Sequence, residues 1–440
     1  MANSATNPDP REPWKNTVNY AVISDVGMRR ANNQDSFSVD IAESQQAWQT
    51  HGHLFVVADG MGAHAAGELA SKLATDLIPH LYKKIQDQAP AEALLKAVTE
   101  SNAEIFRRGQ ANIEFRNMGT TCSLLCMLPE GAVIAHVGDS RVYQLHGDKL
   151  YQLTFDHSLV WEMLAGGEVT DETARSGVIP KNVITRSLGP NAGVQIDIEG
   201  PFPIQKGDRF LLCSDGLSGQ ITDEEIGAIL RTLEPKYAVQ LFVDLSNLRG
   251  GPDNITAVVA EAIDPRIMTS GQGSLTVSRR GAKKQFSTAL GVVTAVCLLA
   301  GLTILVMIPD LWPLAIVTCV LGLIALATGF AQVFWSSNET ATTERRYGNG
   351  PYRSYPAVAG LALFEHLAGT MKALREAAIE RQWKIHWEPI DELFRTARAA
   401  ADAGNFSSAV QNQSMVIIRL MEQIRRQRRG GEPSDSAIDL

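Results

Sequence analysis

Three short apolar segments of this chain each lead into an aspartate, and a fourth begins just after one. Asp59 ends LFVVAD, Asp139 follows VIAHVG and Asp215 follows RFLLCS, whereas Asp253 lies in the glycine-rich turn GGPDN that precedes ITAVV. Segments of this length and composition are typical of buried strands, so we expect the carboxylates at strand ends. If those ends meet, unpaired anions crowd one cleft at a cost of several kcal/mol each. Hard divalent cations with oxygen ligands remove that cost, which predicts a hydrolytic metal site.

Strand-like and helical patterns are mixed from about residue 16 to residue 264. The strand candidates between 119 and 145 follow one another without a helical pattern between them, which favours layered, largely antiparallel sheets and an α+β fold. Thr222 followed by Glu225 is typical of a capping box at a helix start. Helical periodicity is present at 66–86, 90–109, 157–166, 222–232 and 235–248.

Length, charge and cysteine usage limit the class of protein. A chain of 440 residues can contain two or more domains, and a net charge of −8 argues against a general nucleic-acid binder. The five cysteines lie inside apolar runs without the spacing of a metal knuckle or a disulfide framework, so we expect buried thiols in a reducing compartment. Residues 1–15 are polar and proline-rich, show no signal peptide and are expected to form a disordered arm.

Two uncharged apolar stretches follow a linker at 265–285 that is rich in Gly, Ser, Thr and Arg. They cover 286–308 and 314–335 and are separated by PDLWP. Each would form roughly 33 Å of helix, which matches the core of a bilayer. A pair of buried core helices is the alternative. We expect a transmembrane hairpin in contact with the lipid bilayer.

Basic residues on both flanks of this hairpin set its expected orientation. Because the turn is short, the two stretches would be antiparallel and both flanks would lie on the same side. The positive-inside rule places that side in the cytoplasm, which predicts a multi-pass protein of the inner cell membrane. The basic flanking residues are Arg279, Arg280, Lys283, Lys284, Arg345 and Arg346.

The C-terminal part is predicted to be a polar linker at 336–356, a helical region at 357–428 and a disordered tail at 429–440. The segment ARAAADAGNFSSAVQ resembles the turn between the helices of a tetratricopeptide unit, but one match does not make a repeat array. A plain helical hairpin is the preferred interpretation. The basic run at 425–429 could contact anionic lipid headgroups or form a solvated helix end that complements the helix dipole.

A series of motifs occurs in an order that resembles one known family. Across about 16–262 the chain resembles the metal-dependent protein serine/threonine phosphatases of the 2C type, in their bacterial form. The resemblance implies that residues 16–264 fold as an αββα sandwich of two largely antiparallel sheets flanked by helices. The motifs are SDVGMRRANNQDSF (24–37), VADGMGAHAAGELAS (57–71), MGTTCSLLC (118–126), HVGDSRVYQL (136–145), TFDHSL (154–159), ITRSLG (184–189), LLCSDGLSG (211–219) and GGPDNITAVV (250–259).

The resemblance also implies the ligands of a dinuclear centre. Asp59 matches the carboxylate that bridges two Mn²⁺ or Mg²⁺ ions, and Gly60 matches a backbone carbonyl ligand of one of them. Asp215 and Asp253 match the other carboxylate ligands of the pair. Such a pair lowers the pKa of a bridging water and holds it for in-line attack on a phosphomonoester.

Further roles follow by the same matching. Asp35 matches a residue that acts through water outside the primary ligands, and Asp139 matches a ligand of a third, weaker ion. Arg30 corresponds to the arginine that grips the substrate phosphate, which a planar guanidinium can do with two hydrogen bonds. Asn254 would help to hold the Asp253 turn.

Some positions depart from the family pattern. Gln34 stands where the family often has glutamate, so one contact to metal-bound water would be neutral. Met61 occupies a position that is histidine in the eukaryotic branch, which leaves His64 or a metal-bound water as the general acid. His64 could equally well only begin a helix. Residues 157–190 would form a mobile flap beside the substrate groove, or a surface loop without a chemical role.

The leading hypothesis is a membrane-anchored phosphatase that faces the cytoplasm and acts on phosphoserine and phosphothreonine proteins. Arg30, Asp59 and Asp215 are the expected catalytic residues. The catalytic and C-terminal regions would both be cytoplasmic, and the C-terminal helices could recruit a partner such as a Ser/Thr kinase. The alternative is a catalytically weak phosphoprotein-binding or scaffolding protein on the same fold, which only Gln34 supports. A third hypothesis makes the apolar hairpin the working part, but it contains no charge that would serve transport.

Overall fold

The computed structural model of the chain forms two compact units. One unit comprises Met1–Val277 together with Tyr347–Leu440, and the other comprises Ser278–Arg346. The chain on both sides of the second unit therefore belongs to the first. Residues 1–12 of the predicted arm, most of both predicted linkers and the predicted tail lie outside the described residues, whereas Trp14 and Lys15 of the predicted arm belong to a 3₁₀ turn. The structure describes residues 13–62, 65–175, 178–180, 183–269, 288–308, 311, 313–314, 316–324 and 347–428.

The first unit contains two antiparallel sheets. Neighbouring strands pair antiparallel throughout both sheets. The first sheet has the order β1 (Val18–Asp25), β11 (Ile255–Ala262), β10 (Arg209–Cys213), β7 (Arg141–His146), β8 (Lys149–Gln152) and β12 (Arg353–Pro356). The second has the order β2 (Asp35–Asp40), β3 (His53–Met61), β5 (Cys122–Leu128), β6 (Gly131–Val137) and β9 (Asp197–Phe202), with β4 (Gly119–Thr120) paired to the end of β3.

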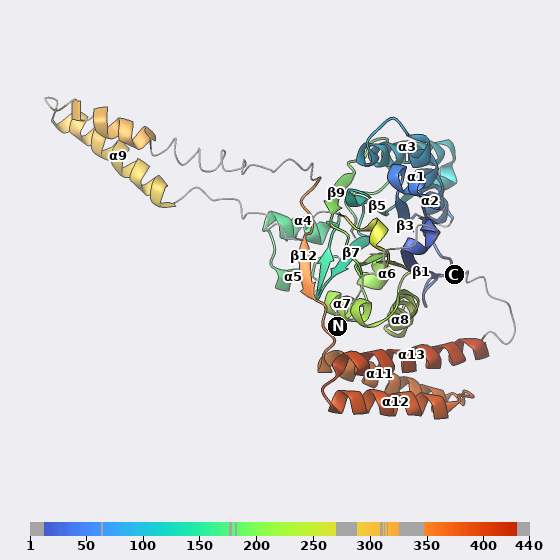
Figure 1. Cartoon of the computed structure of the whole chain (residues 1–440). Coiled ribbons are helices and arrows are strands. Elements are labelled where there is room, and N and C mark those ends of the chain that lie inside the picture. Colours follow the sequence, from blue (N-terminus) through green and yellow to red (C-terminus); the bar gives the residue numbers. More distant parts are fainter. Residues whose placement is uncertain are drawn as a thin grey trace, which may run out of the picture. The chain divides into compact units, whose positions relative to one another are not determined.

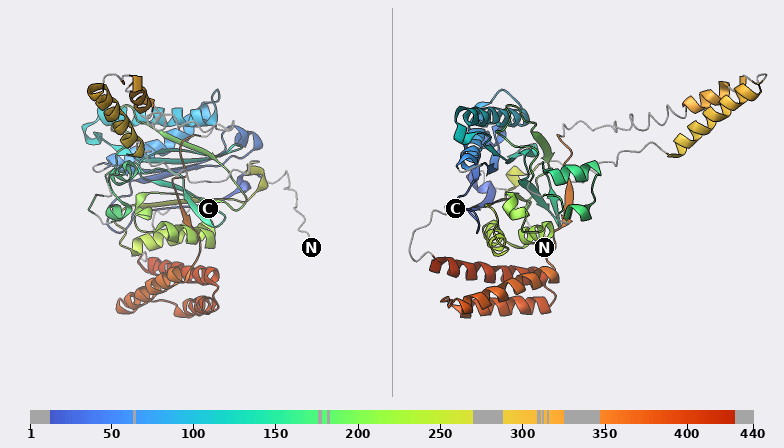
Figure 2. Two further views of the ribbon diagram at one scale, coloured as in Figure 1. Left: turned by 90° about the vertical axis from the view of Figure 1, so that its left-hand side faces the viewer. Right: turned by 180° about the vertical axis from the view of Figure 1, so that it is seen from behind.

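Helices cover the outer face of each sheet (Figures 1 and 2). Helices α2 (Ala66–Lys84) and α3 (Pro90–Ala111) lie on the second sheet, and α7 (Asp223–Thr232) and α8 (Pro235–Leu248) lie on the first. The predicted αββα sandwich is therefore confirmed. The shorter helices are α1 (Gln45–Thr50), α4 (Leu159–Gly166), α5 (Asp171–Arg175), α6 (Asp215–Ser218) and the 3₁₀ turns Trp14–Thr17, Ile113–Phe115 and Pro265–Ile267.

The apolar pattern of the strands explains this layering. Along β3, Val56 packs against the helices of its own layer, whereas Phe55 and Val57 pack into the core between the two sheets. Successive side chains of a strand point to opposite faces, so a strand covered on both faces is apolar at nearly every position. The helix starts follow local signals too. Thr222 accepts from the Glu225 N–H and the Glu225 carboxylate accepts from the Thr222 N–H, which confirms the predicted capping box of α7.

The residues after the second unit complete the first one. Strand β12, within the stretch predicted as a linker, adds to the edge of the first sheet beside β8. Three helices follow: α11 (Leu361–Glu380), α12 (Trp387–Asp402) and α13 (Phe406–Arg428). The last two form the predicted helical hairpin, with Gly404 in its turn, and α11 precedes it. The buried side chains of all three helices share one core with α7 and α8, as Phe364 and Ile417 do. The C-terminal helices are thus an added layer of the sandwich (Figure 1).

The second unit does not bear out the predicted membrane hairpin. Helix α9 covers Thr288–Met307, and the longest described helical piece of the second apolar stretch, at 316–324, is roughly 14 Å long at 1.5 Å per residue. Among the residues that the structure describes, no helix has both the length and the apolar character needed to cross a bilayer. The predicted transmembrane hairpin (286–308 and 314–335), its contact with lipid and the location in the inner cell membrane are therefore wrong. Residues 325–335 of the second predicted span lie outside the described residues.

A buried ion pair joins the C-terminal layer to the sandwich. Arg425 of α13 donates to Oδ1 of Asp244 on α8, whose side chain is fully buried. Burial raises the pKa of Asp244 to about 6, although Arg425 lowers it. Above that pH the folded protein keeps a buried charge that Arg425 must neutralise, whereas below it Asp244 is protonated and needs no cation.

Replacing Arg425 by alanine should therefore destabilise the protein by about 3 kcal/mol at pH 8, and by clearly less at pH 5. Urea denaturation of the full chain at the two pH values measures this difference. Arg426→Ala is the matched control, because Arg426 pairs with an exposed Glu422, and such a pair is worth less than about 1 kcal/mol. If Arg425→Ala lowered the free energy of unfolding equally at pH 8 and at pH 5, Arg425 would not be neutralising a buried charge on Asp244.

Candidate metal centre

Five aspartates from distant parts of the chain meet at one end of the sandwich. Asp59 is near the end of β3 and pairs in register with Asp35 at the start of β2. Asp139 follows β6, Asp215 follows β10 and begins α6, and Asp253 precedes β11. Asp59 and Asp215 lie within hydrogen-bonding reach of each other, and the charges of Asp35, Asp139 and Asp253 also act on Asp59. The structure thus brings together all the carboxylates that the sequence analysis singled out.

Burial and mutual repulsion perturb this cluster strongly. Burial, followed by the charges of neighbouring aspartates, raises the pKa of Asp139 to about 8 and that of Asp215 to about 6. Burial is again the largest cause for Asp35, whose pKa rises to about 7, and it also raises the pKa of Asp59 well above its usual value. Buried carboxylates with raised pKa values are stabilised either when they bind protons or when they bind a cation.

The donor set of the cluster fits a hard divalent cation. Oδ1 of Asp35, Oδ1 of Asp139 and Oδ1 of Asp215 are buried and have no hydrogen-bond partner. Within the described residues, no group of three or more His, Cys, Asp or Glu side chains is arranged closely enough to hold a metal ion by itself. The unpartnered oxygens nevertheless suit Mg²⁺ or Mn²⁺, because such ions can bind one or two carboxylates each and complete their coordination with water and carbonyl oxygen.

Hydroxyl groups hold two of the aspartates in place. Oδ2 of Asp35 accepts from Ser214 Oγ and Thr256 Oγ1, each at 2.7 Å. The N–H of Asp59 donates to Thr121 Oγ1 at 2.8 Å, and its carbonyl accepts from Thr120 Oγ1 at 3.0 Å. These hydrogen bonds fix the ends of strands from both sheets around the acidic cluster.

Arg30 lies at the mouth of the cluster on the loop between β1 and β2. Its Nη2 donates to Oδ2 of Asp253 at 2.7 Å, and the side chain is 50% exposed. This hydrogen bond is the largest cause that raises the pKa of the Arg30 guanidinium, with smaller contributions from the charges of Asp59 and Asp215. A half-exposed cation among these carboxylates is placed to meet an incoming anion.

Asn254 ties the Arg30 loop to the turn of Asp253. Its Nδ2 donates to the carbonyls of Val26 and Asn32, and its Oδ1 accepts from the Gln34 N–H at 2.8 Å. The side-chain amide of Gln34 contacts the Gly62 carbonyl at 3.4 Å. His64, the candidate general acid, lies outside the described residues.

Two glycines of the site are required for close packing of the backbone. A Cβ on Gly60 would lie 2.2 Å from the Gly67 carbonyl oxygen, and one on Gly216 would lie 1.9 Å from that of Asn254. Gly60 therefore lets the end of β3 approach the first turn of α2, and Gly216 lets the segment of Asp215 approach that of Asp253.

A cavity of about 490 Å³ adjoins the cluster and contains residues that the sequence analysis missed. Asp139 and Asp215 form one wall, and Trp161 of α4, in the predicted flap, forms another. Arg353 of β12 completes it, with its guanidinium 4.1 Å from the Trp161 ring centroid. No sequence signal indicated Arg353, because β12 is far along the chain and reaches the cavity only through sheet pairing.

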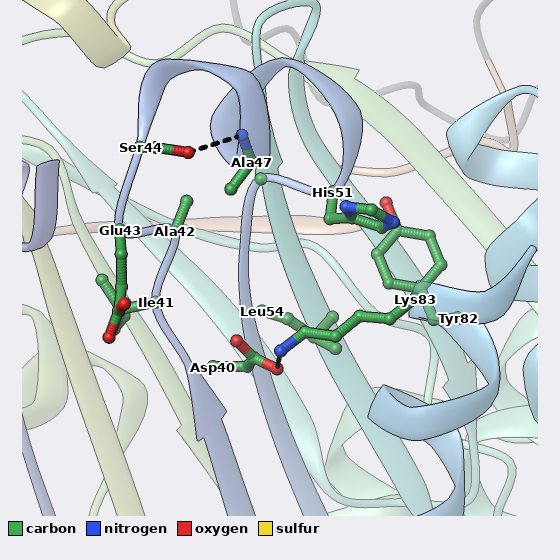
Figure 3. A pocket seen from close by; sticks show the side chains of 11 residues that line it. Asp40, Ile41, Ala42, Glu43, Ser44, Ala47, His51, Leu54, Tyr82 and Lys83 are labelled. Carbon is green, nitrogen blue, oxygen red and sulfur yellow. Dashed lines mark hydrogen bonds and ion pairs between the residues drawn. The ribbon is translucent and has the colours of Figure 1, made fainter. Parts of the chain in front are cut away.

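A second cavity, of about 440 Å³, lies at the other end of β3 (Figure 3). It is lined by Leu54 and His51, and Lys83 forms an ion pair with Asp40 inside it. Leu54 is five residues from Asp59, or roughly 17 Å along a strand. This cavity is therefore separate from the acidic cluster.

Comparison with known proteins agrees with this fold. The sequence profile described as Protein phosphatase 2C matches residues 28–245. The serine/threonine phosphatase stp of Listeria innocua is 38% identical over 245 residues, which cover 54% of this chain and 93% of that protein. Protein phosphatase PhpP of Streptococcus pneumoniae is 36% identical over 246 residues, covering 55% of this chain and 96% of that protein. The solved structure of the Mycobacterium tuberculosis serine/threonine phosphatase PstP/Ppp matches with a TM-score of 0.50 and 34% identity. The match covers 56% of this chain and 99% of the chain of that structure.

The fold and these matches define a protein phosphatase. The chain belongs to the protein phosphatase 2C family of serine/threonine phosphatases, and it is a phosphoprotein phosphatase. The family uses divalent metal ions, in agreement with the cluster. The profile match ends at residue 245, before β12 and the three C-terminal helices.

Charge repulsion in the cluster predicts how stability depends on pH and metal. Because the folded-state pKa values of Asp35, Asp139 and Asp215 are raised, the metal-free protein should gain stability as the pH falls from about 8 towards 5. Mn²⁺ should stabilise most at pH 8, by about 2.7 kcal/mol at a hundredfold excess over its Kd. Thermal unfolding with chelator or with Mn²⁺ measures both effects.

Asp59→Asn provides the matched test of that prediction. Removing this negative charge should raise the unfolding temperature of the chelator-treated protein at pH 8 and should reduce the stabilisation by Mn²⁺. A metal-free variant less stable than the wild type at pH 8, together with an unchanged Mn²⁺ effect, would show that Asp59 is not part of a metal centre.

Proposed function

We propose that this protein removes phosphate from phosphoserine and phosphothreonine in other proteins, using two divalent cations, Mn²⁺ or Mg²⁺. Asp59 would bridge the ions, with Asp215, Asp253 and the Gly60 carbonyl as further ligands. The observation that carries the proposal is the convergence of buried carboxylates with unpartnered oxygens at one open end of the sandwich. Bound here, the cations would neutralise the charge of the phosphate and supply an activated water.

The remaining site residues have roles that their contacts support. Arg30 would bind two phosphate oxygens, because its guanidinium is half exposed and is directed at the cluster by Asp253. Asp35, which Ser214 and Thr256 hold by one oxygen, would act through water with its other oxygen. Asp139, on the side of the cavity, would bind a third and weaker ion.

The cavity beside the cluster would receive the substrate chain around the phosphorylated residue. Its walls come from the flap helix α4 and from β12, so both segments would contribute to substrate choice. The predicted recruitment of a Ser/Thr kinase by the C-terminal helices stays a prediction, since no contact among the described residues indicates such a partner. The alternative of a non-catalytic scaffold has no support beyond Gln34, because every predicted carboxylate is present in the cluster.

Phosphate release from a phosphothreonine peptide by the full chain tests the proposal. Hydrolysis should require Mn²⁺ or Mg²⁺ and should fall by about 100-fold or more in Asp215→Asn, because a carboxylate that would hold a cation at the reacting phosphate is lost. Asp76→Asn is the control, since Asp76 is exposed on α2 and pairs only with Lys72. Its activity should match that of the wild type.

Two results would reject the proposal. One is hydrolysis that a chelator does not reduce. The other is phosphopeptide binding, measured by isothermal titration calorimetry, without any release of phosphate by the Mn²⁺-loaded wild type.

A further inference from the structure

His157 is a fully buried histidine whose contacts join the flap to the loop that presents Asp139. It belongs to the motif TFDHSL, between β8 and α4, and its side chain is not exposed to solvent. Buried polar side chains need partners, so each hydrogen bond of the imidazole has a structural consequence. Its two ring nitrogens bind partners in two different segments.

The first set of contacts fixes the loop of Asp139. The Gly138 N–H donates to Nδ1 of His157 at 3.0 Å, and the His157 N–H donates to the Gly138 carbonyl at 2.7 Å. Gly138 has a φ of +112°, and a Cβ there would lie 2.5 Å from Thr121 Cγ2, so this loop conformation is strained for any other residue. His157 therefore binds both the backbone N–H and the carbonyl of Gly138, the residue that precedes Asp139.

The second set of contacts reaches Asp197 at the start of β9 and, through it, the C-terminal end of the flap at Thr185–Arg186. Because a backbone N–H can only donate, Nδ1 of the neutral ring is the acceptor and Nε2 carries the proton. Nε2 therefore donates to Oδ2 of Asp197 at 3.0 Å, and Oδ1 of Asp197 accepts from Arg186 at 3.0 Å. The His157 carbonyl also accepts from the Thr185 N–H at 2.8 Å.

The Asp139 loop is in turn connected to Asp59. Ser140 Oγ is hydrogen-bonded to Thr121 Oγ1 at 2.8 Å, and the same Thr121 oxygen accepts from the Asp59 N–H. A continuous chain of hydrogen bonds thus runs from the flap, through His157 and the Asp139 loop, to Asp59. Apart from the Arg186 guanidinium, the links are between backbone groups and short or buried side chains, which limits how far one end can move without the other.

We propose that His157 is a positioning residue of the phosphatase reaction, which couples the flap segment Thr185–Arg186 to the loop that presents Asp139 to the metal centre. This inference rests on the proposed function of the acidic cluster. The flap borders the cavity next to Asp139, so substrate contacts on the flap would be transmitted to the metal loop. The imidazole is suited to this role because its two nitrogens hold two segments at once.

His53 offers a matched control in the same protein. It is equally buried, its Nδ1 accepts from the Ala42 N–H at 3.0 Å, and its Nε2 is bonded to Thr17 Oγ1 at 2.9 Å. These contacts lie at the start of β3, at the end of the sandwich opposite to Asp59. A role limited to core stability would make substitutions of His53 and His157 behave alike.

The experiment compares three substitutions of His157 in the full chain, namely His157→Leu, His157→Asn and His157→Gln. Leucine removes both hydrogen bonds of the ring. Asparagine places an acceptor near the position of Nδ1 and keeps the bond to Gly138, whereas glutamine places a donor near Nε2 and keeps the bond to Asp197. Should the leucine variant fail to fold, the other two still separate the two contacts.

Three measurements follow on each variant and on His53→Leu and His53→Asn. They are the unfolding temperature in chelator, Mn²⁺ binding by isothermal titration calorimetry without substrate, and kcat and KM for a phosphothreonine peptide and for p-nitrophenyl phosphate. We expect all substitutions to lower the unfolding temperature. Only His157→Leu and His157→Gln should weaken Mn²⁺ binding, by about tenfold or more. His157→Asn should keep Mn²⁺ binding but raise KM for the peptide more than for the small ester.

The inference would be overturned if His157→Leu and His157→Gln bound Mn²⁺ as tightly as the His53 variants do. It would also be overturned if His157→Asn and His157→Gln had the same Mn²⁺ affinity and the same KM for the peptide. The metal titration does not depend on turnover. If the wild type bound Mn²⁺ but released no phosphate, the proposed function would fail, while the calorimetric comparison would still decide whether His157 positions the metal loop.

Discussion

Repulsion among buried carboxylates is the constraint around which the rest of this structure is organised. Asp35, Asp59, Asp139 and Asp215 all have raised pKa values because burial and neighbouring anions disfavour their charged forms. The folded chain keeps them together through many contacts elsewhere, in three apolar cores that two sheets and their helices form. The stability that the apolar cores provide thus offsets the repulsion in the acidic cluster, which is unfavourable until a cation binds there.

The site is held from both sheets, which makes its geometry a property of the whole sandwich. Asp35 and Asp59 come from one sheet, whereas Asp215 and Asp253 flank strands of the other. Hydroxyl groups complete the connection, since Ser214 and Thr256 on the first sheet hold Asp35 on the second. A relative shift of the two sheets would therefore separate the ligands of the proposed dinuclear centre.

The later part of the chain contributes more to this phosphatase unit than its position suggests. Strand β12 pairs with β8, and its residue Arg353 stacks on Trp161 of the flap helix. The C-terminal helices bury their apolar faces against α7 and α8. The profile of the family ends before these elements, and one of them, β12, reaches the cavity beside the acidic cluster. They are the natural place to look for features that distinguish this protein from its shorter relatives.

Local signals in the sequence determined much of this protein by themselves. The strand that leads into Asp59, the capping box at Thr222 and the alternation of buried side chains follow from short-range chemistry, and the motif order led to the family. The location in the inner cell membrane was a wrong prediction, because it rested on apolar composition alone and no described helix meets the requirements for crossing a bilayer. Only the tertiary structure decided that β12 completes a sheet, that α13 packs on α8 and that His157 joins the flap to the Asp139 loop. Those contacts connect residues that are far apart in the chain, and no local pattern specifies which distant partner a strand edge or a buried imidazole will meet.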